Sequence, residues 1–127
     1  MKPIKDFKAL NMTTSLKEII SEITKGGAGF AWVKDKNKSF KLSGIITDGD
    51  LRRSLQKYSY ETWGMLTAKD LMIKDPITIS YKAMGTEALK LMEKNRKKPI
   101  SILPVTDDLN KVIGILKLHD LLQEGIK

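Results

Sequence analysis

Hydrophobic and polar residues follow two different periods along the chain, one typical of helices and one typical of strands. Four apolar residues have the spacing of a single helical face: Leu16, Ile19, Ile20 and Ile23. The segment 15–18, Ser-Leu-Lys-Glu, places a hydroxyl and a carboxylate where a capping box needs them, which predicts the helix start. Gly26 and Gly27 predict its end, because glycine readily adopts the backbone conformation that terminates helices. The first predicted element is therefore an amphipathic helix.

A β-hairpin and a second helix are predicted after this turn. The apolar segments 30–33 and 40–46 have the length and residue types of strands, and the polar residues 35–38 predict the turn between them. Thr47 or Asp48 then supplies a side-chain oxygen that can cap the following helix. The returning strand is therefore expected to lead directly into a helix N-terminus.

The same order of elements recurs 70 residues further along the chain. Residues 44–51, Gly-Ile-Ile-Thr-Asp-Gly-Asp-Leu, match residues 114–121, Gly-Ile-Leu-Lys-Leu-His-Asp-Leu. The second copy has its own helical stripe, at Ala88, Leu91 and Met92. Its hairpin strands are predicted at 100–105 and 111–116, and a last helix is predicted to open at Asp120. Such self-similarity indicates a duplicated structural unit.

A short connecting segment separates the two copies. Residues 67–72 predict a short helix, and Asp75-Pro76 breaks it before a strand at 77–79. Each copy is then a β-α-β-β-α unit, which we divide as a first repeat, 1–66, and a second repeat, 67–127. One such unit is too small to bury its own sheet face, so we expect an α/β (α+β) fold with the two sheets packed about a pseudo-two-fold axis.

The composition narrows the classes of function. Hydrophobic residues make up 41% of the chain and charged residues 30%, as in ordinary globular domains. No apolar run approaches the ~20 residues that span a bilayer, and the first residues do not resemble a secretory signal, so we expect a cytoplasmic protein. The absence of cysteine excludes disulfides, thiolate metal sites and cysteine nucleophiles, and a lone histidine excludes a histidine-rich metal site. A net charge of +8 favours anionic partners.

The segment 44–53 has residue types suited to a phosphorylated ligand. Gly44 allows its strand to approach another backbone closely. The unpaired backbone N–H groups at the start of the next helix favour phosphate oxygens, and Thr47 adds a hydroxyl donor there. Asp50 can accept hydrogen bonds from two neighbouring ribose hydroxyls, and Arg53 can pair with a further negative group. One strand-to-helix turn therefore offers both a phosphate donor and a sugar acceptor.

The second copy departs from this pattern. Lys117 replaces the threonine, whereas Asp120 is retained at the equivalent position. Lysine can still hold a phosphate, as a mobile point charge. His119 lies at the start of the last helix, where a histidine is either a surface or capping residue or a contact to a ligand or domain. We therefore expect one good site and one altered site.

These strings resemble a known family over nearly the whole chain. The residues at 44–50 and the connecting segment 70–79, Asp-Leu-Met-Ile-Lys-Asp-Pro-Ile-Thr-Ile, are similar to those of a tandem pair of cystathionine-β-synthase-type (CBS) domains. With Leu-His-Asp-Leu-Leu at 118–122, they look like the C-terminal CBS pair of arabinose 5-phosphate isomerases, enzymes of the Kdo branch of lipopolysaccharide or capsule synthesis. In that family an N-terminal sugar-isomerase domain performs the chemistry. The resemblance implies a regulatory fragment or a stand-alone relative, with no catalytic residues and no required cofactor.

The resemblance also implies a ligand and its contacts. In CBS pairs the base or equivalent group lies between the repeats, against the hairpin strands, and the implied effector is an adenine nucleotide or a sugar nucleotide such as CMP-Kdo. The candidate ligand-binding residues, from the motif and the resemblance together, are Gly27, Ala28, Thr47, Asp48, Asp50, Arg53, Thr78, Ile102, Pro104, Lys117, His119 and Asp120. CBS pairs commonly associate through their helices, so a homodimer is expected as well.

Plainer interpretations of the same residues remain open. Thr47 and Asp50 can simply cap a helix, and the chain can be a structural dimerisation module without a ligand. The basic cluster Lys94, Arg96, Lys97 and Lys98 raises the alternative of a nucleic-acid-binding module. Aromatic residues total only 6% and are not interleaved with that cluster, which favours solvated surface charge over nucleic-acid binding.

Overall fold

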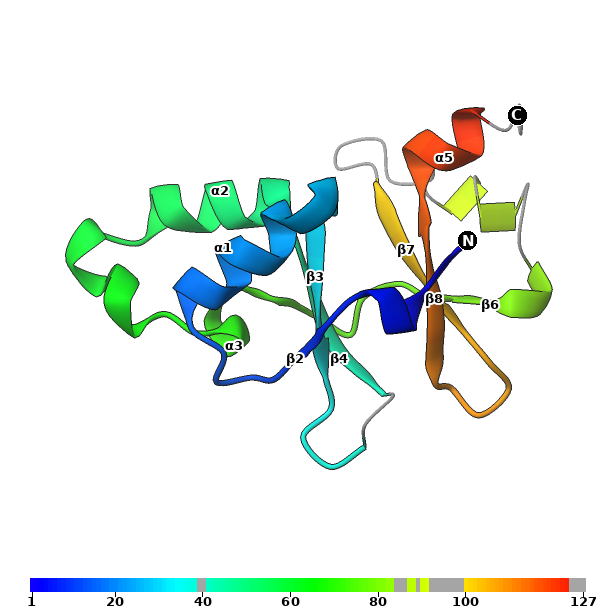
Figure 1. Ribbon diagram of the computed structural model, residues 1–127, viewed down its shortest axis with the longest axis horizontal. Coiled ribbons are helices and arrows are strands. Elements are labelled where there is room, and N and C mark those ends of the chain that lie inside the picture. Colours follow the sequence, from blue (N-terminus) through cyan, green and yellow to red (C-terminus); the bar gives the residue numbers. More distant parts are fainter. Residues whose placement is uncertain (39–40, 84–86, 89, 92–99, 124–127) are drawn as a thin grey trace. The chain divides into compact units, whose positions relative to one another are not determined.

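The chain folds into two compact units (Figure 1). The computed structural model describes residues 1–38, 41–83, 87–88, 90–91 and 100–123. The first unit comprises Phe7–Pro76, and the second comprises Met1–Asp6 together with the chain from Ile77 onward. Each unit contains one four-stranded sheet. The segment at the start of the sequence therefore belongs to the same unit as the second half of the chain.

The first unit is a mixed sheet accompanied by helices. Its strands lie in the order β2 (Ala9–Leu10), β3 (Phe30–Lys34), β4 (Leu42–Thr47) and β5 (Ile73–Lys74). β2 is parallel to β3, and the remaining neighbours are antiparallel. Its helices are α1 (Leu16–Thr24), α2 (Asp48–Lys57) and α3 (Ala68–Leu71), with 3-10 turns at Lys25–Gly27 and Tyr60–Met65. α1 packs against β3, and α2 follows directly from β4.

The second unit repeats this sheet with the same connections. Its strands lie in the order β1 (Lys2–Pro3), β8 (Val112–Lys117), β7 (Ile102–Thr106) and β6 (Ile79–Ser80). β6 is parallel to β7, and the other neighbours are antiparallel. The chain leaves β8 into α5 (Leu118–Gln123), and 3-10 turns lie at Ile4–Asp6 and Tyr81–Ala83. The residues described within 87–91 are helical as well.

The strand registers confirm the internal repeat. Phe30 pairs with Thr47 in the first hairpin, and Ile102 pairs with Lys117 in the second. In both hairpins the register shifts between the last two residues of the first strand, at Val33/Lys34 in β3 and at Val105/Thr106 in β7. The two hairpins are therefore equivalent residue by residue, including their irregularity.

The two sequence repeats exchange their edge strands. β1, at the start of the first repeat, pairs with β8 of the second repeat, and β5, near the start of the second repeat, pairs with β4 of the first. A methyl group on Gly44 would lie 2.9 Å from the carbonyl oxygen of Ile73, and one on Gly114 would lie 3.0 Å from that of Lys2. Both glycines thus permit an edge strand to approach, as predicted for Gly44. The division at 66/67 follows the sequence repeat, whereas the compact units combine segments from both sides of it.

Each unit has its own hydrophobic core. The buried residues of the first core are Leu10, Ile19, Ile23, Ala31, Val33, Ile46, Leu51, Leu66, Ala68 and Leu71. Those of the second core are Ile79, Ala88, Leu103, Val105 and Leu116. Ile20 was predicted to share the buried stripe of the first helix, but its side chain is 39% exposed. A nine-residue helix lying on a sheet buries only a narrow face, and Ile20 falls beside that face.

Most predicted elements are confirmed, and their boundaries move by a few residues. The predicted capping box of the first helix forms only in part, because Ser15 Oγ accepts the N–H of Glu18 at 3.4 Å while the Glu18 carboxylate binds Lys8 Nζ at 2.6 Å. The last helix begins at Leu118 and not at Asp120. Met92, assigned to the second helical stripe, lies outside the described residues.

The connecting segment contains one element that was not predicted. A short strand, β5, lies between the predicted helix and Asp75, where the helix was expected to end at Asp75-Pro76. Asp75 has a positive φ of 47°, and its N–H donates to the carbonyl of Ser43 at 3.3 Å. The sharp turn at Asp75 therefore ends the edge strand, and the next strand, β6, begins at Ile79 where 77 was predicted.

Candidate functional site

A strand-to-helix corner in the first unit contains half of the predicted site residues. This first corner consists of Gly27–Gly29 and Thr47–Arg53. The N–H of Asp48 donates to the carbonyl of Gly29 at 2.9 Å, which ties the start of α2 to the loop before β3. Gly27 and Gly29 have φ values of 69° and 79°, a region that favours glycine. The glycine loop thus folds back against the helix start, so Gly27 and Ala28 lie in the same corner as Thr47.

Thr47 and Asp50 form a reciprocal capping box at this corner. The N–H of Asp50 donates to Thr47 Oγ1 at 3.1 Å, and the N–H of Thr47 donates to Asp50 Oδ2 at 3.1 Å. Both hydrogen bonds satisfy backbone donors that the helix itself leaves unpaired. The plainer interpretation of these two residues, helix capping, is therefore confirmed. Capping holds the hydroxyl and the carboxylate in fixed positions on one helical turn.

Two arginines balance the carboxylates of the first corner. Arg53 Nη2 lies 2.8 Å from Asp50 Oδ1, and Arg52 Nη2 lies 3.5 Å from Asp48 Oδ2. The Asp50 side chain is only 17% exposed, whereas that of Arg53 is 59% exposed. A methyl group on Gly49 would lie 3.2 Å from Arg53 Nη1, so the guanidinium lies over the first turn of α2. The first corner is consequently close to electrically neutral.

The second unit has the same corner backbone with different side chains. This second corner consists of Ser101–Ile102 and Lys117–Asp120. The N–H of Leu118 donates to the carbonyl of Ser101 at 2.9 Å, as Asp48 does to Gly29 in the first unit. Lys117 occupies the position of the capping threonine, and an ammonium group has no lone pair with which to accept a backbone N–H.

The charge on Lys117 is disfavoured in the folded protein. Burial lowers the pKa of Lys117, the neighbouring ammonium of Lys2 lowers it further, and the Asp120 carboxylate acts in the opposite direction. Lys2 belongs to β1, where it pairs with Ile115, two residues before Lys117 on the adjacent strand. The second corner therefore holds two positive groups and one negative group.

The remaining predicted residues of the second unit differ in exposure. Pro104 is fully buried, and it lies on the face of β7 opposite to the core residues Leu103 and Val105. Thr78 is partly buried just before β6, and Ile102 is partly buried at the start of β7. His119 is exposed on the first turn of α5. Parallel pairing of β6 with β7 places Thr78 and Ile102 at the same end of the sheet as Lys117.

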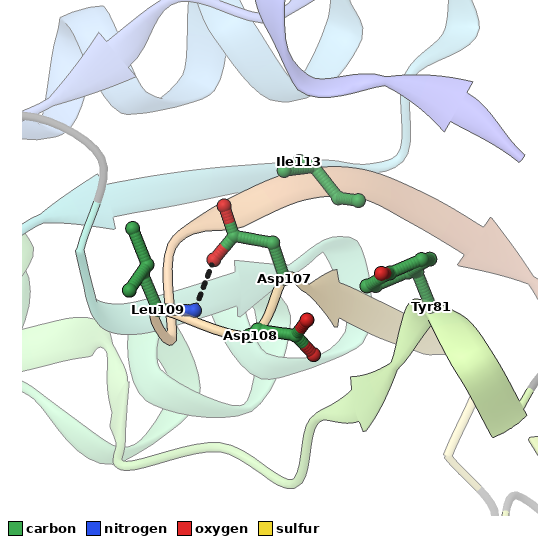
Figure 2. Close-up of a pocket in the computed structure, with 5 residues that line it drawn as sticks. All are labelled: Tyr81, Asp107, Asp108, Leu109 and Ile113. Atoms are coloured by element: carbon green, nitrogen blue, oxygen red, sulfur yellow. Dashed lines mark hydrogen bonds between the residues drawn. The ribbon is translucent and has the colours of Figure 1, made fainter.

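Hollows in the surface lie elsewhere, beside the hairpin turns. In the second unit a shallow hollow of about 270 Å³ is lined by Tyr81, Asp107, Asp108, Leu109 and Ile113. Figure 2 shows Tyr81 on one side and Leu109 on the other, with the Asp107 carboxylate accepting the N–H of Leu109 at 2.9 Å. In the first unit a hollow of about 400 Å³ is lined by Met12, Asp35, Leu42, Ser43, Lys69, Met72, Lys74 and Asp75. None of the predicted site residues lines either hollow.

Comparison with known proteins settles the family. The CBS domain family matches residues 2–57 and again residues 68–127. The chain is a pair of CBS domains. Solved structures agree with this assignment, because CBSX2 of Arabidopsis thaliana in complex with AMP is 25% identical, with a TM-score of 0.77 over 98% of this chain and 91% of that one. The CBS domain protein NE2398 is 22% identical and has the same fold, with a TM-score of 0.79 over 98% and 94% of the two chains.

The CBS pair is also similar to part of two sugar-phosphate isomerases. Arabinose 5-phosphate isomerase KpsF of Escherichia coli is 38% identical over 115 residues, which cover 91% of this chain and 33% of that protein. Arabinose 5-phosphate isomerase KdsD of Pseudomonas aeruginosa is 37% identical over 113 residues, which cover 89% and 32%. The CBS pair thus spans about a third of the length of the curated relatives it matches. Within the described part of the chain, no helix is long and apolar enough to cross a bilayer.

One residue at the second corner was not among the predicted site residues. Lys2 reaches the corner because β1 pairs with β8, a contact between segments far apart in the sequence. The signal for it was present in the repeat, since Met1-Lys2-Pro3 occupies the same position beside β8 as Met72-Ile73-Lys74 beside β4. The equivalence was not found from the sequence because each of these segments pairs with a strand of the other repeat.

Proposed function

We propose that this CBS pair is a regulatory module that binds a nucleotide or sugar nucleotide at its strand-to-helix corners. The observation that carries the proposal is the arrangement of the first corner, where Thr47, Gly49 and Asp50 present a hydroxyl, backbone and a carboxylate within one turn of α2. The AMP complex of the similar CBS pair supports a nucleotide as the ligand.

The first corner can bind both parts of a nucleotide. The ten-residue helix α2 directs its partial positive charge toward Gly49, and the absence of a side chain there leaves room for a phosphate. The Arg53 guanidinium lies beside Gly49, so a small rotation moves it from Asp50 to the phosphate. That movement frees Asp50 Oδ1 to accept a ribose hydroxyl. Arg53 in this proposal holds the carboxylate in place until the ligand arrives.

The relatives suggest what the module regulates. The matching part of KpsF and KdsD is one third of each isomerase, which leaves most of those proteins for other functions. We place this CBS pair as the regulatory part of an arabinose 5-phosphate isomerase, and we place the reaction itself in a separate sugar-isomerase domain. CMP-Kdo is then a ligand to test beside AMP, because an end product of the same branch is a natural inhibitor.

Titration calorimetry with AMP and with CMP-Kdo tests the proposal. We expect one of them to bind the wild-type chain and Asp50→Asn to weaken binding about tenfold or more, since a hydrogen bond to a charged group contributes about 1.5–3 kcal/mol. Asp70→Asn is the matched control, because Asp70 Oδ2 accepts the N–H of Thr67 at 2.9 Å in the same capping geometry at α3. Absence of heat with both ligands, or equal affinity in Asp50→Asn, contradicts the proposal.

A specific surface feature favours dimerisation as a second candidate function. Tyr60 and Met65, at the two ends of one 3-10 turn, are each 76% exposed, and the rings of Tyr60 and Trp63 lie 5.1 Å apart. Exposed aromatic and methionine side chains are enriched in protein interfaces. Light scattering is expected to give a dimer mass for the wild-type chain and a monomer mass for Tyr60→Glu, and a wild-type monomer would rule this candidate out.

A further inference from the structure

The hollow of the first unit, the first hollow, is lined by charged side chains of both signs. Its volume of about 400 Å³ is within the range of about 300–1,000 Å³ that is usual for small-molecule sites. The charged residues come from the hairpin turn, from α3 and from the end of β5: Asp35, Lys69, Lys74 and Asp75. Two carboxylates and two ammonium groups balance, so the first hollow suits a ligand with one group of each sign better than a polyanion.

Backbone hydrogen bonds hold the walls of the first hollow together. The N–H of Lys69 donates to the carbonyl of Met12 at 3.0 Å, which ties α3 to the segment before α1. The N–H of Asp75 donates to the carbonyl of Ser43 at 3.3 Å, which ties the end of β5 to β4. All of the lining residues belong to the first unit. The first hollow is therefore formed by one unit alone.

The charged side chains of the first hollow do not neutralise one another. In the part of the chain that the structure describes, none of the four takes part in an ion pair. Asp35 Oδ1 accepts the N–H of Asn37 at 2.9 Å, which orients the carboxylate. The two carboxylates of the first corner are, in contrast, each paired with an arginine. Charged groups of both signs thus face the first hollow with their ion-pairing capacity unused.

Three apolar side chains also line the first hollow: Met12, Leu42 and Met72. All three are partly buried. The Met72 thioether lies over Gly44, where an added methyl group would be 2.5 Å from Met72 Sδ. Methionine is unbranched and polarisable, so it adapts to apolar groups of different shapes. The first hollow therefore places an apolar surface beside its charged groups.

We propose that the first hollow binds a free α-amino acid with an apolar side chain. The carboxylate of the amino acid pairs with Lys69 or Lys74, its ammonium group pairs with Asp35 or Asp75, and its side chain packs on the methionines. The site is separate from the first corner, because Leu42 and Thr47 are the two ends of β4, about 16 Å apart at about 3.3 Å per residue. This inference does not rest on nucleotide binding at the corners.

NMR of the methionine methyl groups, titrated with L-leucine, L-methionine and L-phenylalanine, tests the proposal. We expect saturable shifts at Met12 and Met72 with at least one of them, and none at Met65, which is 76% exposed and does not line the first hollow. N-acetyl-L-leucine lacks the ammonium group and L-leucinamide lacks the carboxylate, so each should bind about tenfold or more weakly than L-leucine. No saturable shift with any of the three amino acids, or equal affinity for L-leucine and both derivatives, overturns the proposal.

Two double variants test which residues recognise the charges. Lys69→Gln/Lys74→Gln removes the positive groups and Asp35→Asn/Asp75→Asn removes the negative ones, and each should weaken amino-acid binding about tenfold. Asparagine suits the positive φ of Asp75, and the amide spectrum of each variant checks its fold. Lys36→Gln, on the same hairpin turn but outside the first hollow, is the matched control and should bind as the wild type does. Wild-type affinity in either double variant overturns the proposal, whatever the outcome with AMP.

Discussion

The two strand-to-helix corners have the same backbone and a different charge balance. Asp48 in the first corner and Leu118 in the second each donate a backbone N–H across the corner at 2.9 Å. In the first corner a threonine caps the helix and an arginine neutralises the carboxylate, whereas in the second a lysine replaces the cap and a second lysine lies beside it. The same corner backbone therefore carries two different sets of charged side chains.

Because the corners differ in charge, their side chains are expected to contribute differently to the stability of the chain with and without a ligand. Thr47 and Asp50 satisfy backbone donors and neutralise charge, so they stabilise the first unit whether or not a ligand is present. Burial and the ammonium of Lys2 disfavour the charge of Lys117, whereas the Asp120 carboxylate favours it. We therefore expect an anionic ligand to add more stability at the second corner than at the first.

The largest expected effect is the loss of stability when one equivalent core residue is shortened in each unit. Ile46 and Leu116 are equivalent residues, each the one before the last residue of its strand, and they are 0% and 4% exposed. Ile46→Ala and Leu116→Ala are each expected to lower the free energy of unfolding by about 2–5 kcal/mol through loss of buried contacts and formation of a cavity. Urea denaturation measures this. A loss below about 1 kcal/mol in only one of the two would show that the units are not equivalent.

A somewhat smaller effect tests the edge strands. Gly44→Ala and Gly114→Ala each place a methyl group about 3 Å from the carbonyl oxygen of the exchanged strand, so both should destabilise the chain by about 1–3 kcal/mol. Thermal and urea unfolding would measure the loss. Gly64→Ala is a suitable control, because a methyl group on Gly64 meets nothing within 4 Å. Equal stability of Gly44→Ala and the control would contradict the close approach of β5.

The corners themselves predict unequal effects of similar substitutions. Thr47→Ala removes a helix cap and should lower the free energy of unfolding by about 0.5–2 kcal/mol. Lys117→Gln removes no cap and relieves repulsion from Lys2, so stability should stay the same or rise. Chemical denaturation of both variants in the absence of ligand provides the comparison. A larger loss in Lys117→Gln than in Thr47→Ala would contradict the different roles assigned to the two positions.

The smallest expected effect is a dependence of stability on pH in the alkaline range. The pKa of Lys117 in the folded chain is lowered from its usual 10.5, so between the folded value and 10.5 the unfolded chain binds more protons. Stability contributed by this group therefore rises as the pH rises through that window, and it is lowest where the lysine is fully charged. Lys2→Gln should bring the pKa of Lys117 closer to 10.5 and reduce the rise. NMR titration of the Lys117 side chain checks both, and an unchanged pKa in Lys2→Gln would contradict the contact between the lysines.

Local patterns in the sequence were sufficient to predict most elements of this fold. The capping residues, the hairpins and the repeat depend on neighbouring residues or on matching strings, so Thr47 was one of the two residues predicted as possible helix caps, and the structure confirms it. The exchange of edge strands depends on pairing between distant segments, and β1 and β5 have only two residues each, too few to show a strand period. Lys2 was missed for that reason.

The candidate site could be predicted only as a set of residue types. The string at 44–50 identified the first corner, but the pairing of Arg53 with Asp50 depends on side-chain rotamers that no sequence pattern specifies. Pro104 was assigned to the ligand by its position on a strand, and it is fully buried on the face of β7 opposite to the core residues Leu103 and Val105. Position along a strand does not by itself tell whether a side chain is accessible to a ligand.

Backbone amide NMR of the wild-type chain, titrated with AMP and separately with CMP-Kdo, tests the central claim most directly. Binding at the corners predicts saturable shifts at 27–29, 47–53 and 117–120 with one of these ligands. Shifts confined to the hairpin-turn hollow around 81 and 107–109, or no saturable shift with either ligand, would contradict the account.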